Sequence, residues 1–199
     1  MYENFNEFIK NNEKLDIKSE REFLEVYNGK SFLNGLYRIH NLEDREKWNE
    51  IIGKTFPPAM GKIMVFGYDW LGRSFAIYNE TDTVLMFEPG TGEAFDTDFN
   101  FYDFHNKEIP TNHLVCLASE YYEKWRKANN NYILPHNKCA GYKVPLFLNG
   151  KDVVENLEIS DMEVYWEIMM PLMNLYPIYL RRCKIAKQPR KSFTAFRYY

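Results

Sequence analysis

The segment GYDWLGRS, residues 67–74, places a carboxylate, an indole and a guanidinium within five positions, between two apolar runs. Such a set could line a ligand site, or it could form the turn of a β-hairpin. The residue types favour the turn, because Asp69 can accept backbone N–H groups, Gly72 can take a positive φ angle and Arg73 can pair with Asp69. The sequence does not decide whether the Trp70 side chain packs over the sheet or is displayed at the surface as an interface anchor. Trp70 is therefore a candidate partner-binding residue.

Other patterns that would support catalysis or cofactor binding are incomplete. The turn PGTG at residues 89–92 lacks the lysine of a phosphate-binding loop and is followed by Glu93. The sequence has no GxSxG nucleophile elbow, and its four histidines match no zinc spacing. We interpret Cys116 and Cys139 as reduced, buried side chains. Catalysis by a cysteine and a histidine that come together only in the fold stays an open alternative. The sequence nevertheless predicts no enzyme: no catalytic residue, no cofactor and no metal.

Carboxylates recur in two stretches of the chain and supply the main candidate binding surface. The calcium-loop pattern DxDxDG is absent, so we expect either a solvated acidic surface or a docking face for a basic protein. On a docking face, complementary charge raises the association rate and rejects wrong partners. The candidate partner-binding residues are Trp70, Glu93, Asp96, Asp98, Glu155, Glu158 and Asp161.

The charge is distributed unevenly along the chain. The formal net charge is −3, but residues 181–199 carry seven basic residues and no acidic one. Residues 1–180 therefore hold 18 basic (25 minus 7) and 28 acidic residues, a balance of −10. Such a body should repel membranes and nucleic acid and attract a basic protein. The tail mixes basic and aromatic residues. We interpret it as a solvated extension or as a segment that folds back on the acidic body, and nucleobase stacking by the tail stays an open alternative.

The order of the expected elements indicates an α+β fold with a twisted, largely antiparallel sheet flanked by helices. Three β-rich runs, residues 62–68, 73–78 and 83–88, predict a meander whose two faces are both covered. A further strand is expected over residues 139–148. Helices are expected over residues 3–11 and 43–52, after the capping residues Ser19, Ser119 and Ser160, and over a short stretch from Asn100.

We expect one domain over residues 1–180 followed by a basic C-terminal tail over residues 181–199. The N-terminal sequence MYENFNEFIK carries acidic residues where a signal peptide has a basic start, so the predicted location is cytoplasmic.

Three blocks of the sequence resemble the SUKH superfamily, which includes fungal regulators of cell-wall synthesis and many bacterial immunity proteins. They are GYDWLGRSFAIY with VLMFEPGTGEAF, then FYDFHNKE, and finally CAGYKVPLFLNGKDVVENLEISDMEVYW. The likeness covers residues 31–170 and is strongest to immunity proteins against type VI secretion DNase effectors. The resemblance implies an α+β fold, no catalysis and function by binding. It brings no site residue with it, because members bind unrelated toxins through diverged surfaces.

Together these observations predict an immunity protein that binds and neutralises a cognate bacterial toxin, a nuclease effector of a secretion or contact-dependent system. A nuclease must be basic to hold DNA, which fits an acidic inhibitor. The alternative is a non-enzymatic adaptor or regulatory scaffold that binds endogenous protein partners.

Overall fold

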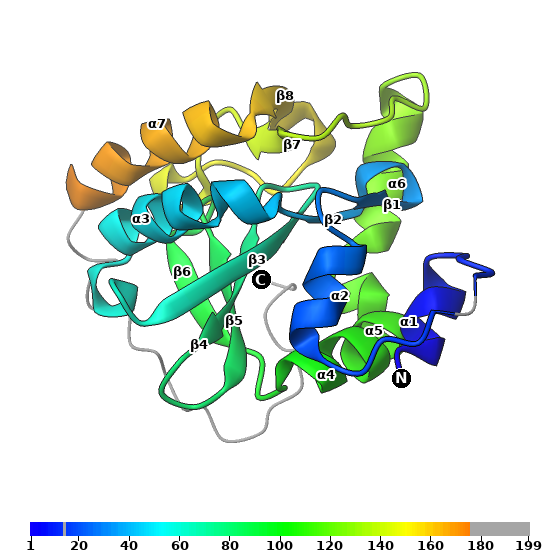
Figure 1. Cartoon of the computed structure of the whole chain (residues 1–199). Helices are drawn as coiled ribbons and strands as arrows, with labels where there is room; N and C mark the ends of the chain where they lie inside the picture. Colours follow the sequence, from blue (N-terminus) through cyan, green and yellow to red (C-terminus); the bar gives the residue numbers. More distant parts are fainter. Residues whose placement is uncertain (14, 176–199) are drawn as a thin grey trace.

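The centre of the protein is a six-stranded antiparallel sheet whose strands lie side by side in chain order (Figure 1). The computed structural model describes residues 1–13 and 15–175. With helices on both faces of the sheet, the predicted α+β fold class is confirmed. The strands of this sheet are β1 (Ser31–Phe32), β2 (Tyr37–Ile39), β3 (Ile63–Asp69), β4 (Ser74–Tyr78), β5 (Thr83–Glu88) and β6 (Glu93–Asp96).

The meander β3–β4–β5 follows the three predicted apolar runs and confirms that both sheet faces are covered. Side chains of a strand alternate between its two faces. In β4, Phe75 and Ile77 belong to one buried apolar cluster, whereas Ala76 and Tyr78 belong to a second cluster on the other side. The nearly continuous apolar pattern of these strands therefore reflects two cores, one on each face.

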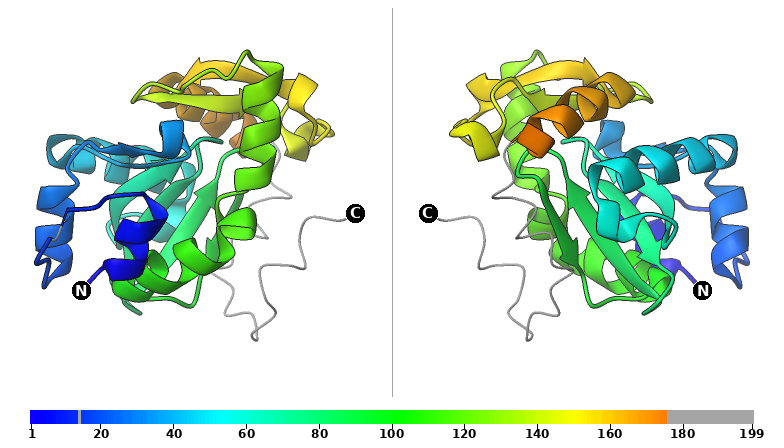
Figure 2. Two further views of the ribbon diagram at one scale, coloured as in Figure 1. Left: turned by 90° about the vertical axis from the view of Figure 1, so that its right-hand side faces the viewer. Right: turned by 90° about the vertical axis from the view of Figure 1, so that its left-hand side faces the viewer.

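The first core lies between the sheet and an aromatic layer of short helices, which Figure 2 shows along one face of the sheet. Within this layer a π-helical turn, Phe104–Glu108, connects α4 to α5 and carries the buried His105. The Nδ1 and Nε2 atoms of His105 lie 2.9 Å from the Phe101 carbonyl and the Tyr37 hydroxyl. The helices are α1 (Glu3–Phe8), α2 (Glu20–Val26), α4 (Phe101–Asp103), α5 (Ile109–Cys116) and α6 (Ser119–Ala128).

The second core lies under two helices that run side by side over the other face, α3 (Arg45–Thr55) and α7 (Met162–Leu175) (Figure 1). The side of α7 that faces the sheet is buried, with Trp166 completely enclosed. The helix predicted over residues 43–52 extends to Thr55 in the structure, so Gly53 lies inside α3. Pro171 lies inside α7, which continues to Leu175.

A second, two-stranded sheet lies beside the main one and consists of β7 (Lys138–Tyr142) and β8 (Leu157–Asp161). The predicted strand over residues 139–148 is therefore too long: it ends at Tyr142, and residues 146–148 form a 3₁₀ turn. Neither β6 nor β8 was expected from the sequence. Both strands are rich in acidic residues, which depress the local strand signal.

One of the three predicted serine caps is confirmed and two are wrong. The Ser19 hydroxyl accepts the Glu22 backbone N–H at 3.2 Å, which begins α2. Ser119 is instead the first residue of α6, and its hydroxyl lies 2.7 Å from Nδ1 of His113. Ser160 lies in β8, and the carboxylate of Asp161 accepts the N–H groups at the start of α7.

Within residues 1–13 and 15–175, no helix is long and apolar enough to cross a membrane. The predicted basic tail, residues 181–199, and its Cys183 lie outside the described residues.

Candidate functional site

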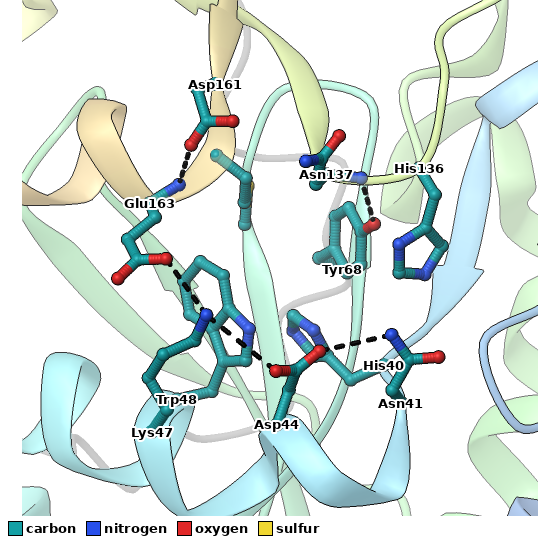
Figure 3. Close-up of a pocket in the computed structure, with 11 residues that line it drawn as sticks. His40, Asn41, Asp44, Lys47, Trp48, Tyr68, His136, Asn137, Asp161 and Glu163 are labelled. Carbon is teal, nitrogen blue, oxygen red and sulfur yellow. Dashed lines mark hydrogen bonds and ion pairs between the residues drawn. The ribbon is translucent and has the colours of Figure 1, made fainter.

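A polar pocket of about 380 Å³ opens where the first turns of α3 and α7 meet the loop before β7 (Figure 3). Its floor is aromatic and its walls carry three carboxylates and one ammonium group. The residues lining it are His40, Asn41, Asp44, Lys47, Trp48, Tyr68, His136, Asn137, Asp161, Met162 and Glu163.

Local structure explains how these side chains converge. A 3₁₀ turn, Leu42–Asp44, leads into α3, so that Asp44, Lys47 and Trp48 lie on one helical face, three and four residues apart. On the opposite side, Asp161 ends β8 and caps α7, which brings Glu163 into the first turn of that helix.

The floor consists of three rings packed together. The imidazole of His40 lies 4.8 Å from the ring centroid of Trp48 and 4.5 Å from that of Tyr68. The hydroxyl of Tyr68 accepts the backbone N–H of Asn137 at 3.0 Å, which fixes the loop above it. Arg38 lies 5.1 Å from the Tyr68 ring centroid. The floor is therefore held rigidly by strands β2 and β3 and by the loop before β7.

His40 carries an unused hydrogen-bonding atom. Only 4% of the residue is exposed, and its Nε2 atom is buried without a hydrogen-bond partner among the residues that the structure describes. Burial, together with the electrostatic influence of the neighbouring His136, Lys47 and Arg38 side chains, holds the pKa of His40 well below its ordinary value. The imidazole is therefore neutral at pH 7, and one ring nitrogen offers a lone pair.

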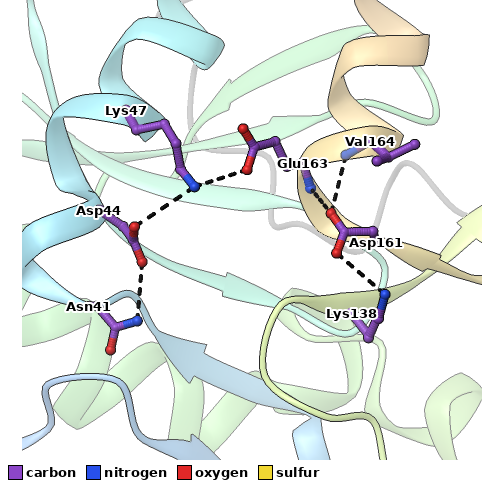
Figure 4. A network of polar contacts seen from close by, with 7 residues as sticks. All are labelled: Asn41, Asp44, Lys47, Lys138, Asp161, Glu163 and Val164. Carbon is purple, nitrogen blue, oxygen red and sulfur yellow. Dashed lines mark hydrogen bonds and ion pairs between the residues drawn. The ribbon is translucent and has the colours of Figure 1, made fainter.

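The walls form a chain of ion pairs that links α3 to α7 (Figure 4). The Nζ atom of Lys47 lies 2.9 Å from a Glu163 carboxylate oxygen and 3.8 Å from an oxygen of Asp44. Its hydrogen bond to Glu163 raises the pKa of Lys47. Asp44 also accepts the side-chain amide of Asn41 at 3.1 Å. One ammonium group therefore serves two carboxylates.

Asp161 forms the second part of this network. Lys138 and Asp161 are direct cross-strand partners in the small sheet, with Nζ 3.3 Å from the carboxylate. Burial raises the pKa of Asp161, but the backbone N–H of Val164, the Lys138 ammonium and the N–H of Glu163 outweigh it, and the pKa is lowered overall. Asp161 is thus a fixed negative charge at the wall.

The charges that line the pocket favour a positively charged ligand. Three carboxylates, Asp44, Asp161 and Glu163, line the pocket. Lys138 pairs with Asp161 and Lys47 is shared between Asp44 and Glu163, so these pairs leave one carboxylate in excess. A cation on aromatic rings gains further attraction from the ring faces. Among the described residues, no group of three or more His, Cys, Asp or Glu side chains could hold a metal ion.

The structure corrects the expectation for Trp70. This residue is 0% exposed, so it does not contact a partner at the surface. Its indole N–H donates to the Leu117 carbonyl at 3.0 Å, and its own carbonyl accepts the Ala140 N–H at 2.7 Å. The tip of the hairpin is enclosed because α6 and β7 close over it, which the local sequence does not encode.

The remaining interpretation of residues 67–74 is confirmed. The Asp69 carboxylate accepts the backbone N–H groups of Leu71 and Arg73 at 3.0 and 3.1 Å, and it pairs with the Arg73 guanidinium. Gly72 has a φ of 78°. Residues 69–73 therefore form a buried structural turn, whereas Tyr68 before the turn lines the pocket.

The six candidate carboxylates do not come from one element. Glu93 and Asp96 belong to the edge strand β6, where side-chain alternation directs them to opposite faces, and Asp98 follows that strand. The other three lie on or beside β8 in the small sheet. Only Asp161 of the six lines the pocket.

Sequence reasoning did not identify the rest of the pocket. Its residues come from four separate segments around positions 40–48, 68, 136–137 and 161–163. The one local signal is at the start of α3, where Asp44 directly before the helix and Lys47 and Trp48 in its first turn place a carboxylate and an amine beside an indole. That pattern is common on solvated helices, so it predicts no site until the facing segments are known.

The two described cysteines are free and buried, as predicted. Burial raises the pKa of Cys116 and of Cys139, so both are neutral thiols and poor nucleophiles at pH 7.

The fold is shared with a solved structure, Atu4351 from Agrobacterium tumefaciens. The two match with a TM-score of 0.59 and 15% sequence identity, over 85% of this chain and 88% of that chain. No family model matches the chain, and no curated protein matches it. What the chain has in common with this structure is its α+β architecture.

Proposed function

We propose that this protein is a cytoplasmic immunity protein that binds and neutralises a cognate bacterial toxin, a nuclease effector of a secretion or contact-dependent system. The observation that carries the proposal is the pocket between α3 and α7, where carboxylates outnumber ammonium groups above a rigid aromatic floor. It is the kind of site that anchors a basic protein.

The charge of the whole chain supports the same kind of partner. Residues 1–180 hold ten more acidic than basic residues. A nuclease is basic where it holds DNA, and the field of an acidic inhibitor accelerates its association. A complex of this kind blocks the toxin by covering the groove that the nucleic acid would enter.

The resemblance of the three sequence blocks to the SUKH superfamily supports the proposal independently of charge. The α+β fold is compatible with it. The buried turn at residues 67–74 also gives those blocks a structural role, because Asp69, Trp70 and Arg73 hold three parts of the fold together.

The test is co-expression of the full chain with the toxin encoded by the adjacent gene. We expect growth to be rescued and the two proteins to co-purify at a 1:1 ratio. The affinity should fall as salt is raised, because screening weakens charge-steered association. If the chain neither rescues growth nor co-purifies with the toxin, the proposal is wrong. Stable complexes with endogenous proteins and no rescue would favour the adaptor alternative.

A further inference from the structure

We propose that the pocket between α3 and α7 receives a single arginine side chain of the partner protein, an inference that rests on the proposed function because it identifies the contact that recognises the basic partner. Three observations carry it: the charges of the walls, the aromatic floor and the unused nitrogen of His40.

The walls are short of positive charge. Lys47 is shared between Glu163 and Asp44, and its side chain is 45% exposed, so it can move toward solvent when a stronger cation enters. A guanidinium carries five donors in a planar fork and can therefore bridge two carboxylates, which an ammonium point charge does less well. The ligand thus completes an ion-pair network that Lys47 completes only in part.

The floor suits the shape of a guanidinium. The rings of Trp48 and Tyr68 each lie tilted against the imidazole of His40, with interplanar angles of 33° and 31°. Planar, weakly hydrated guanidinium groups stack on aromatic rings. The cavity volume of 380 Å³ lies near the lower end of the range of about 300–1,000 Å³ that is typical of ligand pockets, which suits one side chain.

The Nε2 atom of His40 supplies the observation that is independent of charge. It is buried, it belongs to a residue lining the pocket, and no described residue bonds to it. A buried polar atom without a partner is costly, so a ligand that donates to it is favoured. With the proton on Nδ1, the neutral ring accepts one guanidinium N–H.

The first experiment uses N-acetyl-arginine amide as the probe and needs no toxin. The full chain is titrated while the indole and imidazole resonances are followed by NMR. We expect saturable binding with a Kd of about 1 mM, the range typical of a ligand of this size. The citrulline analogue keeps the shape but lacks the charge, and it should bind about tenfold more weakly. Equal binding of the two probes overturns the proposal.

Two substitutions then test the walls. Glu163→Gln should lower the affinity for the arginine probe about threefold. Glu167→Gln, one turn further along α7 and outside the pocket, should leave that affinity unchanged. Lys47→Gln should strengthen binding about threefold, because it frees two carboxylates. Weaker binding after Lys47→Gln would show that the freed carboxylates do not bind the guanidinium and would overturn the proposal. Thermal melting of each variant verifies that it is folded.

The outcomes separate this inference from the proposed function. A chain that neutralises the toxin but does not bind the arginine probe disproves the arginine pocket and leaves the immunity function in place. A chain that binds the probe but does not neutralise the toxin supports the pocket and disproves the immunity function.

Discussion

The carboxylate of Asp69 and the guanidinium of Arg73 form an ion pair at which Asp69 is 0% and Arg73 3% exposed. Burial opposes the charge of Arg73, but the Asp69 carboxylate outweighs it, so the pKa of Arg73 is raised. Arg73 also donates to the Cys116 carbonyl at 2.9 Å, which ties the hairpin to the end of α5. The pair is therefore a joint between secondary-structure elements in the interior.

Removing one member of this pair should destabilise the fold strongly. Asp69→Asn leaves the Arg73 guanidinium buried without its counter-charge, so we expect a loss of about 3–5 kcal/mol in the free energy of unfolding. The double variant Asp69→Asn/Arg73→Met should lose less than Asp69→Asn alone, because no charge is then left unpaired. Urea unfolding measures both, and equal losses in the single and double variants would contradict this account.

Substitutions of Trp70 should lower the stability of the fold without removing a contact to the partner. Trp70→Phe keeps most of the ring packing and loses the N–H bond to Leu117, for a cost of about 1–3 kcal/mol. Trp70→Ala leaves a cavity and should cost about 3–5 kcal/mol. A Trp70→Phe protein of normal stability that no longer binds the toxin would restore the interface interpretation.

Gly72 should tolerate a side chain less well than Gly61. Both have positive φ angles, 78° and 70°, which cost an L-residue about 1–2 kcal/mol. A Cβ at Gly72 would lie 3.1 Å from Cys139 and from Tyr165, whereas nothing lies within 4 Å of one at Gly61. Gly72→Ala should therefore lower the melting temperature more than Gly61→Ala, and equal shifts would show that the neighbours yield without cost.

The cap of α7 can be assigned by two substitutions. Asp161→Ala removes the acceptor of the Glu163 and Val164 N–H groups and should cost about 1 kcal/mol. Ser160→Ala should change the free energy of unfolding by less than half of that. The reverse order in chemical denaturation would reinstate Ser160 as the cap.

His105 should make the protein sensitive to mild acid. Burial lowers the pKa of His105 to about 3 in the folded state, against 6.5 when unfolded. The unfolded chain therefore binds a proton that the folded chain does not, and stability falls as the pH drops from 6.5 toward 3, by up to about 1.4 kcal/mol per pH unit. The gap in stability between the wild type and His105→Gln should be constant at pH 7–8 and should narrow at pH 4.5. A gap independent of pH would contradict this.

The meander could be read from the sequence because its determinants are local. The runs that became β3, β4 and β5 are long and apolar, and Asp69 and Gly72 define the turn by their own backbone preferences. The strands β6 and β8 could not be read, because pairing with β5 and β7 forms them in spite of their charges. The same limit explains why the local sequence predicts Ser160 as the cap of α7, although Asp161 has that role.

The pocket could not be predicted for a different reason. Each lining residue is unremarkable within its own segment, and the site arises when β2 and α3 meet the start of α7 and the loop at residues 136–137. The hydrogen bond from Asn137 to Tyr68 joins residues 69 positions apart. Long-range contacts of this kind carry no local sequence signature.

The turn at residues 67–74 cannot complete its contacts until a much later part of the chain has been synthesised. The Gly72 carbonyl accepts the indole N–H of Trp166, a residue made 94 positions later. At about 5–20 residues per second, the ribosome needs about 5–20 s to supply that partner. A nascent chain that stops before Trp166 therefore presents an unfinished turn to chaperones and proteases.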